Sequence, residues 1–143
     1  MTYRYLDDTA IADVAFEARG NDLEDLFRSA WEATLATMID NPECIARKTT
    51  HRVNVHQNRT DLLLHDFLQE LLFYKDAEGI LLQVDQLNIK AEESQYRLDA
   101  VLAGEKIDHA RHEMRVDVKA VTFYQLYVDH SETGWRATVV LDV

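Results

Sequence analysis

The sequence predicts a single α+β domain spanning residues 1–143, with a mainly antiparallel sheet and two packed amphipathic helices. Three observations predict this class. Two segments carry apolar residues at helical spacing, the other apolar residues alternate as in strands, and the strand segments outnumber the helices and gather in the C-terminal half as hairpin-like neighbours. The length is that of one ordinary domain, and four glycines and one proline leave little material for a linker.

Two helices are expected where apolar residues recur every three or four positions. The first covers residues 23–38, with Asn21 as its N-cap and Glu24 in the position that completes a capping box. The second covers residues 63–72, with Thr60 as its candidate cap. Each helix has one apolar stripe, which we expect to lie on a sheet.

Strands are expected where apolar and polar residues alternate. The closing segment is the clearest, because Leu141 and Val143 belong to an apolar face while Asp142 belongs to the opposite face. The segment 82–89 should contain an irregularity, and the four glycines should lie in turns. The expected strands lie near residues 3–5, 13–18, 53–55, 82–89, 96–102, 116–128 and 135–143.

The net charge of −11 is the most informative bulk property. Affinity for nucleic acid comes largely from Lys and Arg side chains that displace counterions from phosphates, so direct general binding of nucleic acid is not expected. A basic protein partner or a bound cation would suit this charge. Solubility alone is an equally good explanation of it.

The composition also predicts where the protein resides. No apolar stretch approaches the roughly 20 residues that a membrane-spanning helix needs. The first residues show no signal-peptide core, and the single cysteine, Cys44, cannot form an internal disulfide. We therefore expect a cytoplasmic protein without a membrane partner.

The sequence lacks the common catalytic motifs. It contains no GxGxxG, no Walker-type phosphate loop and no GxSxG nucleophile elbow. Cys44 has no base identifiable beside it, so it is not expected to be a nucleophile. His109 and His112 have a spacing that suits two zinc ligands, but exposed or hydrogen-bonded histidines in a loop are the favoured interpretation, because no further zinc ligand pattern accompanies them.

Two carboxylates near opposite ends of the chain form a candidate metal site. Asp13 alternates away from apolar Val14, and Asp142, the penultimate residue, alternates away from its apolar neighbours. If the two strands pair, the carboxylates meet at one end of the sheet. Oxygen ligands of this kind select calcium or magnesium over zinc. Solvated aspartates at strand ends are the competing interpretation.

Several segments, taken in order, resemble the archease family. They are YRYLDDTA, VAFEARG, DLEDLF, LHDFLQELLF, DAEG, GEKIDHARH, VKAVTFYQL and GWRATVVLDV. The resemblance covers nearly the whole chain and implies an α+β fold. It also implies a protein cofactor of the RNA ligase that joins 2′,3′-cyclic phosphate or 3′-phosphate ends to 5′-hydroxyl ends in tRNA splicing or RNA repair. That ligase uses GTP and manganese, and an archease accelerates its guanylylation and turnover without catalysing a reaction itself.

The resemblance also implies particular site residues. The family's metal site, usually occupied by calcium, is built around two aspartates that correspond to Asp13 and Asp142. The N-terminal His-Thr-Ala-Asp motif is altered here to DDTAIAD, which places Asp8 at the histidine position as an extra oxygen donor. Asp40 is a further candidate ligand, and Lys119 is expected to contact the ligase or hold a carboxylate. Magnesium and manganese use the same oxygen ligands as calcium.

Two other functions remain open from the sequence. One is a metal-dependent phosphoesterase that uses the same carboxylates and needs no partner. The other is a general chaperone or adaptor for enzymes that modify nucleic acids. Tyr124 stands where many members of the resembling family carry a histidine, so any role of that histidine is altered here.

Overall fold

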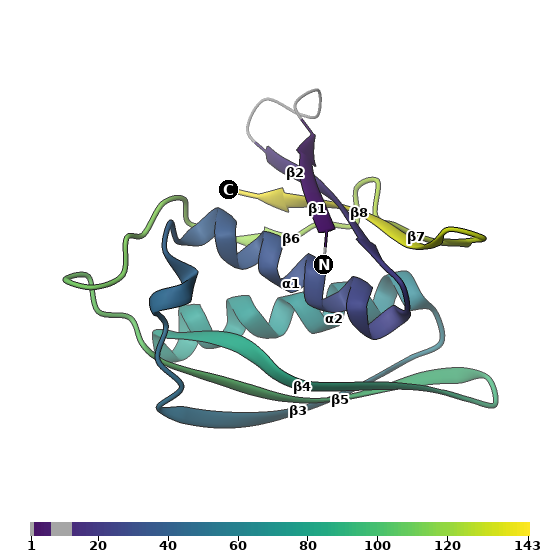
Figure 1. Cartoon of the computed structure of the whole chain (residues 1–143), viewed down its shortest axis with the longest axis horizontal. Helices are drawn as coiled ribbons and strands as arrows, with labels where there is room; N and C mark the ends of the chain where they lie inside the picture. The colour runs from purple at the N-terminus through teal and green to yellow at the C-terminus, as the bar shows by residue number, and fades with distance from the viewer. Residues whose placement is uncertain (1, 7–12) are drawn as a thin grey trace.

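The computed structural model describes residues 2–6 and 13–143. Two helices lie between two antiparallel sheets, one above and one below them in Figure 1. The predicted α+β class with two packed helices is confirmed. The α-helices and strands, in chain order, are β1 (Thr2–Leu6), β2 (Asp13–Gly20), α1 (Leu23–Met38), β3 (Thr49–Gln57), α2 (Thr60–Phe73), β4 (Ile80–Glu92), β5 (Gln95–Lys106), β6 (Ala120–Val121), β7 (Tyr127–Ser131) and β8 (Gly134–Asp142). A short 3-10 helix (Pro42–Cys44) follows α1, and a π-helical turn (Tyr74–Glu78) follows α2.

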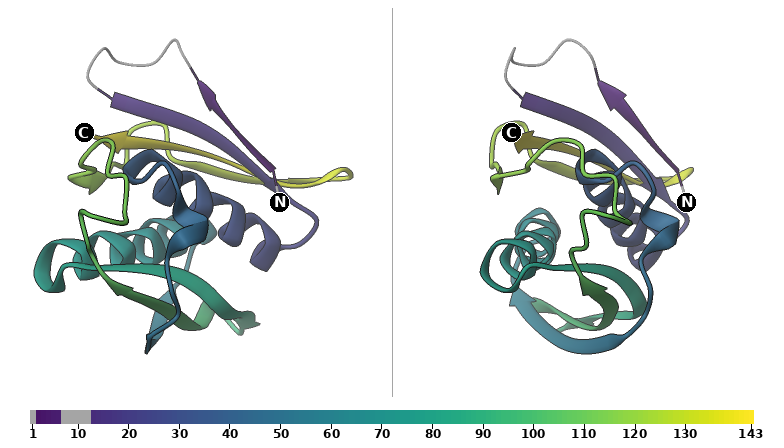
Figure 2. Two further views of the ribbon diagram at one scale, coloured as in Figure 1. Left: turned by 60° about the vertical axis from the view of Figure 1, so that its left-hand side comes forward. Right: turned by 90° about the vertical axis from the view of Figure 1, so that its left-hand side faces the viewer.

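The two sheets differ in how they use the chain. The larger sheet has the order β1-β2-β8-β6, with β7 also paired to β8, so it joins the two ends of the described chain. The smaller sheet has the order β3-β5-β4 and is built from the middle of the chain. The expected irregularity lies in β4, where the register shifts between Val84 and Gln86. The two views in Figure 2 show the helices covering one face of each sheet.

The core lies between the sheets and is centred on the helices. Trp31 of α1 is fully buried, and its indole N–H donates a hydrogen bond to the Leu82 carbonyl of β4 over 2.9 Å. The Phe67 ring of α2 lies 4.7 Å from the Trp31 ring and 5.9 Å from the Phe27 ring, measured between centroids. These contacts fix the helices to each other and to the smaller sheet.

Helix α1 has the predicted bounds, whereas α2 begins three residues earlier and ends one residue later than predicted, and the caps of both helices differ from the prediction. Asp22, rather than Asn21, caps α1: its carboxylate accepts a hydrogen bond from the Asp25 N–H. The Asp25 carboxylate in turn accepts from the Asn21 N–H, so Asp25, rather than Glu24, completes the arrangement. Thr60 is the first residue of α2 instead of its cap, and no side chain caps that helix.

The predicted strand over residues 116–128 is wrong. Only Ala120–Val121 and Tyr127–Ser131 pair as strands in this part of the chain. The backbone just before β6 and at its end bonds to side chains of α2 and of the segment after it: the Val118 carbonyl accepts from the buried Lys75 ammonium over 2.9 Å, and the Val121 N–H donates to the Gln69 side chain over 2.8 Å. Side chains of α2 and the turn after it therefore replace a strand partner.

Gly104 is the one glycine that lies inside a strand rather than in or beside a turn. It pairs within β5 against Leu82 of β4 and Thr49 of β3. A Cβ at this position would lie 1.8 Å from the Leu81 carbonyl oxygen, so the close approach of the two strands requires glycine.

Candidate functional site

The structure pairs the two strands that carry Asp13 and Asp142. Strands β2 and β8 run antiparallel, and Asp13 lies directly opposite Asp142 at one end of the pair, where β2 begins and β8 ends in Figure 1. Residues directly opposite each other in a sheet project from the same face, with Cβ atoms about 4.5–5.5 Å apart. The two carboxylates, distant in the sequence, therefore share one position on the sheet.

This position lies on the sheet face that points away from the helices. Phe16 of β2 and Val139 of β8 are opposite each other and belong to the core, so the alternate positions project outward. A third strand adjoins the pair, because Ala120 of β6 lies opposite Asp142 on its other side. The Lys119 N–H donates to the Asp142 carbonyl over 2.8 Å, which fixes this strand against β8.

The two aspartates lack the charge compensation that their neighbour has. Glu17, on the same face of β2, lies 3.0 Å from Arg19 and 3.6 Å from Arg4. Among the described residues, no Lys, Arg or His side chain makes an ion pair with Asp13 or Asp142. Like charges directly opposite each other in a sheet are destabilising. A hard cation held by both carboxylates would remove this repulsion, so the donor set fits calcium or magnesium.

The other residues expected at the metal site have different surroundings. The Asp40 carboxylate pairs with Arg115 at 3.2 Å, and Arg115 and Asp13 both line a hollow of about 280 Å³. Lys119 is exposed next to the Asp142 strand. Asp8 lies outside the described residues. Within residues 2–6 and 13–143, no three His, Cys, Asp or Glu side chains form a group that would hold a metal.

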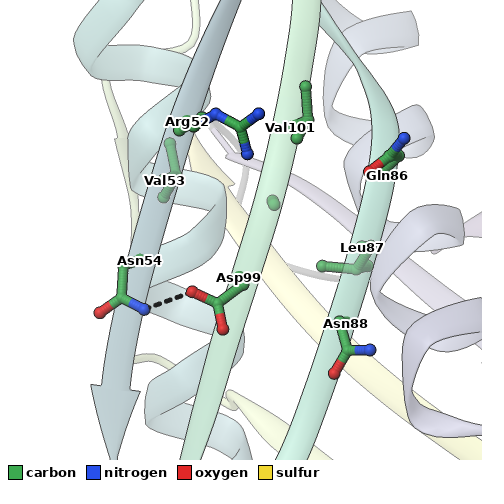
Figure 3. A pocket seen from close by; sticks show the side chains of 9 residues that line it. Arg52, Val53, Asn54, Gln86, Leu87, Asn88, Asp99 and Val101 are labelled. Carbon is green, nitrogen blue, oxygen red and sulfur yellow. Dashed lines mark hydrogen bonds between the residues drawn. The ribbon is translucent and has the colours of Figure 1, made fainter.

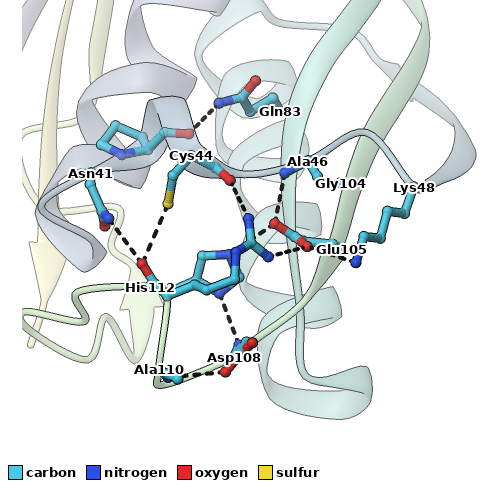
Figure 4. A network of polar contacts seen from close by, with 12 residues as sticks. Asn41, Cys44, Ala46, Lys48, Gln83, Gly104, Glu105, Asp108, Ala110 and His112 are labelled. Carbon is cyan, nitrogen blue, oxygen red and sulfur yellow. Dashed lines mark hydrogen bonds and ion pairs between the residues drawn. The ribbon is translucent and has the colours of Figure 1, made fainter.

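A second polar cluster, which sequence reasoning did not assign, centres on the buried Glu105 (Figure 4). Its carboxylate accepts hydrogen bonds from Arg111 at 2.7 Å, from the Ala46 N–H at 2.7 Å and from His112 at 3.0 Å. Arg111 and the other donors hold the pKa of Glu105 far below its ordinary value. Arg111 also donates to the Cys44 carbonyl, so the cluster ties the loop after α1 to the end of β5.

The tautomer of His112 follows from its two contacts. Its Nδ1 accepts from the Asp108 N–H over 2.9 Å, so the ring proton is on Nε2, which donates to Glu105. His109, in contrast, is exposed. The favoured interpretation of two exposed or hydrogen-bonded histidines is therefore the one that the structure supports. The spacing of acid, aspartate, arginine and histidine in GEKIDHARH was the only sequence signal of this cluster.

A hollow on the outer face of the smaller sheet has a different chemistry (Figure 3). It has a volume of about 370 Å³ and is lined mainly by amides and aliphatic side chains, together with Arg52 and Asp99. The Asp99 carboxylate accepts a hydrogen bond from the Asn54 amide across the strands. This hollow therefore holds a single carboxylate that already has a partner, whereas the opposed pair in the larger sheet has no cationic partner within residues 2–6 and 13–143.

The fold and the carboxylate pair define the class of this protein: a small α+β domain with a candidate cation site on the sheet face that points away from the helices. The chain belongs to the archease family, since the model of the Archease protein family (MTH1598/TM1083) matches residues 3–143. No helix among the described residues is long and apolar enough to cross a membrane.

Individual relatives agree with the family assignment. Protein archease of Methanosarcina mazei is 33% identical over 142 residues, which cover 99% of this chain and 95% of that protein. Protein archease of Methanothermobacter thermautotrophicus is 34% identical over 132 residues, which cover 92% and 93% of the two chains.

Two solved structures share the fold. The solution structure of protein 1598 of Methanobacterium thermoautotrophicum has a TM-score of 0.84 at 32% identity and covers 99% of this chain and 98% of its own. A Thermotoga maritima protein, described as an archease and possible chaperone, has a TM-score of 0.64 at 19% identity, with coverage of 94% and 93%.

Asp142→Asn should remove both the repulsion and the cation response. In a chelator, the variant should be as stable as the wild type or more stable by about 0.2–1 kcal/mol, because like charges no longer face each other. Millimolar calcium should raise the melting temperature of the wild type but not that of the variant. Scanning calorimetry measures both effects, with Glu92→Gln at the exposed β4–β5 hairpin as control. Equal calcium responses of all three proteins would refute the site.

The Glu105 cluster predicts a pH-dependent stability. Because the pKa of Glu105 is lowered in the folded state, its contribution is present above about pH 4.3, the pKa of a free glutamate, and is lost as the pH falls below it. At pH 7, Glu105→Gln should lower the free energy of unfolding by about 2 kcal/mol, since it weakens buried charge-assisted hydrogen bonds. Urea denaturation at pH 7 and at acid pH should show this difference shrinking. A constant difference would contradict the prediction.

Proposed function

We propose that this chain is a non-catalytic activator of the RNA ligase that joins 2′,3′-cyclic phosphate or 3′-phosphate ends to 5′-hydroxyl ends. It would promote guanylylation of the ligase and multiple turnover, as its family membership suggests. The proposal includes a cytoplasmic location, which the single cysteine and the absence of a described membrane-spanning helix suit.

The observation that carries the proposal is the opposed pair of Asp13 and Asp142, for which the described residues supply no cationic partner. Both aspartates are partly exposed on the sheet face away from the helices, and three strands fix their positions. A partly exposed pair held in this way suits contact with the site of another protein. A bound calcium or magnesium ion would neutralise the two carboxylates and offer remaining ligand positions to that partner. Asp8 and Asp40 are the further proposed ligands, and Lys119 the proposed partner contact.

An activator changes the equilibrium of its partner only through a difference in affinity between two partner states. A net charge of −11 favours association with the basic surface that an RNA-binding ligase must present to phosphates. We propose that the chain binds a ligase state that is competent for guanylylation better than the spent state. The same charge disfavours direct binding of the chain to RNA.

Two alternatives make different predictions. A metal-dependent phosphoesterase would hydrolyse small phosphoesters without a partner, because its metal would activate water in its own pocket. We expect no such activity, since no third His, Cys, Asp or Glu side chain of the described residues joins the carboxylate pair to hold a catalytic metal. A general chaperone or adaptor would assist several nucleic-acid-modifying enzymes equally; the Thermotoga maritima protein is described as a possible chaperone. Assays with the purified ligase and with an unrelated RNA-modifying enzyme separate these functions.

The direct test measures multiple-turnover joining by the purified ligase with and without this chain. Wild type should increase turnover. Asp13→Asn and Asp142→Asn should keep the fold, but their stimulation of turnover should be at least tenfold smaller. Glu92→Gln, an exposed carboxylate at a distant hairpin, should stimulate like the wild type. Full stimulation by both aspartate variants would refute the role of the pair, and no stimulation by the wild type would refute the proposed function.

A further inference from the structure

Three aromatic side chains gather on a short exposed segment beside the carboxylate pair. Phe123, Tyr124 and Tyr127 are 64%, 57% and 50% exposed, although they lie within five residues of one another. Scattered exposed aromatic residues need no explanation, but a contiguous group of them marks an interaction surface. We call residues 122–127 the aromatic turn.

The aromatic turn is held rigidly. The Thr122 backbone N–H and hydroxyl both donate to the Val140 carbonyl of β8, over 3.0 and 2.9 Å. The Leu126 N–H donates to the Phe123 carbonyl, and the Leu126 side chain packs against the core. Gln125 adopts a left-handed conformation with φ of 52°, which a non-glycine residue adopts only where its surroundings impose it. The turn is thus closed and anchored at both ends.

Helix α2 supports the same turn from the side. The His65 ring stacks on the Phe123 ring at 4.1 Å between centroids. Its two nitrogens contact the Val121 carbonyl and the Asp66 carboxylate, each over 3.0 Å, so the ring orientation is fixed. Aromatic groups that are ordered before binding lose little conformational entropy on association, and this is the property of a binding anchor.

The aromatic turn is continuous with the carboxylate pair. Ala120, two residues before the turn, lies opposite Asp142. Tyr127 lies opposite Thr138, and Thr138 projects from the same face of β8 as Asp142 because the two positions differ by four. A partner that covers the turn therefore also approaches the carboxylates.

The charge of the surroundings decides the class of partner. The chain has a net charge of −11, and the carboxylates of Asp13, Asp142 and Asp66 lie on the elements that border the turn. Exposed aromatic groups can stack on the bases of RNA, but these negative charges repel its phosphates. They repel an anionic membrane for the same reason. A basic protein surface with an apolar pocket complements both the aromatic side chains and the acidic border.

We propose that the aromatic turn is the docking anchor of this protein. Phe123, which His65 holds in place, inserts together with Tyr124 and Tyr127 into an apolar pocket rimmed by Lys or Arg on a protein partner. The docking aligns Asp13 and Asp142 with that partner's active site. This inference rests on the proposed function, because it takes the RNA ligase as the partner. The aromatic turn provides the affinity for the ligase, and the two carboxylates activate it.

The test separates affinity from activation. Calorimetric titration of the purified ligase with the full chain should show that Tyr124→Ser and Tyr127→Ser each weaken the Kd at least tenfold. Both variants should still give full stimulation when they saturate the ligase. Asp142→Asn should show the opposite pattern, with near-normal Kd and little stimulation. Phe73→Ser removes an aromatic side chain that is 55% exposed at the end of α2 and should bind like the wild type.

Three outcomes would overturn the inference. Normal Kd values of both tyrosine variants would refute the role of the turn as an anchor. The proposed function would still stand, provided that the wild type stimulates the ligase. Binding of a fluorescent single-stranded RNA by the wild type, lost in the tyrosine variants, would show that the turn stacks on bases instead. No binding of the wild type to the ligase would overturn both the anchor and the proposed function. Melting curves of each variant confirm that the fold is retained.

Discussion

The pairing of β2 with β8 is the constraint on which the rest of the structure depends. It brings the first and last parts of the described chain into one sheet, and its register places Asp13 opposite Asp142. The inward residues of both strands form the core against the helices, so a shift by one residue would expose that core and turn the aspartates inward. Burial on one face therefore fixes the position of the carboxylates on the other.

Glu17 and the aspartate pair differ in their charged neighbours, and this difference distinguishes the candidate site. All three acids project from the same face of the sheet. Glu17 has two arginines beside it, whereas Asp13 of β2 and Asp142 of β8 lie opposite each other. A protein that needed these acids only for solubility would gain stability by separating them. An opposed pair of carboxylates at this position has a cost in the isolated chain, and a cation or a basic partner would offset it. The neighbouring aromatic turn supplies the apolar contact that charge alone cannot.

Much of the fold was predictable from the sequence, because helical and strand periodicity report directly on burial. The same alternation placed Asp13 and Asp142 on the outward face, and the resemblance to archeases singled out both. The features that could not be predicted depend on contacts between residues that are distant in the sequence. The segment around Val118 reads as a strand, but side chains of the second helix and the turn after it take its hydrogen bonds. The Glu105 cluster and the rigid aromatic turn likewise arise only when separate segments meet.

We propose that Asp13 and Asp142 together hold a hard cation. A crystal structure of the chain grown with calcium, with anomalous differences collected, would locate such an ion. A calcium ion bound by the pair should give an anomalous peak at about 2.3–2.6 Å from oxygen atoms of both carboxylates. A peak held by neither aspartate, or none at the pair in crystals saturated with calcium, would contradict it.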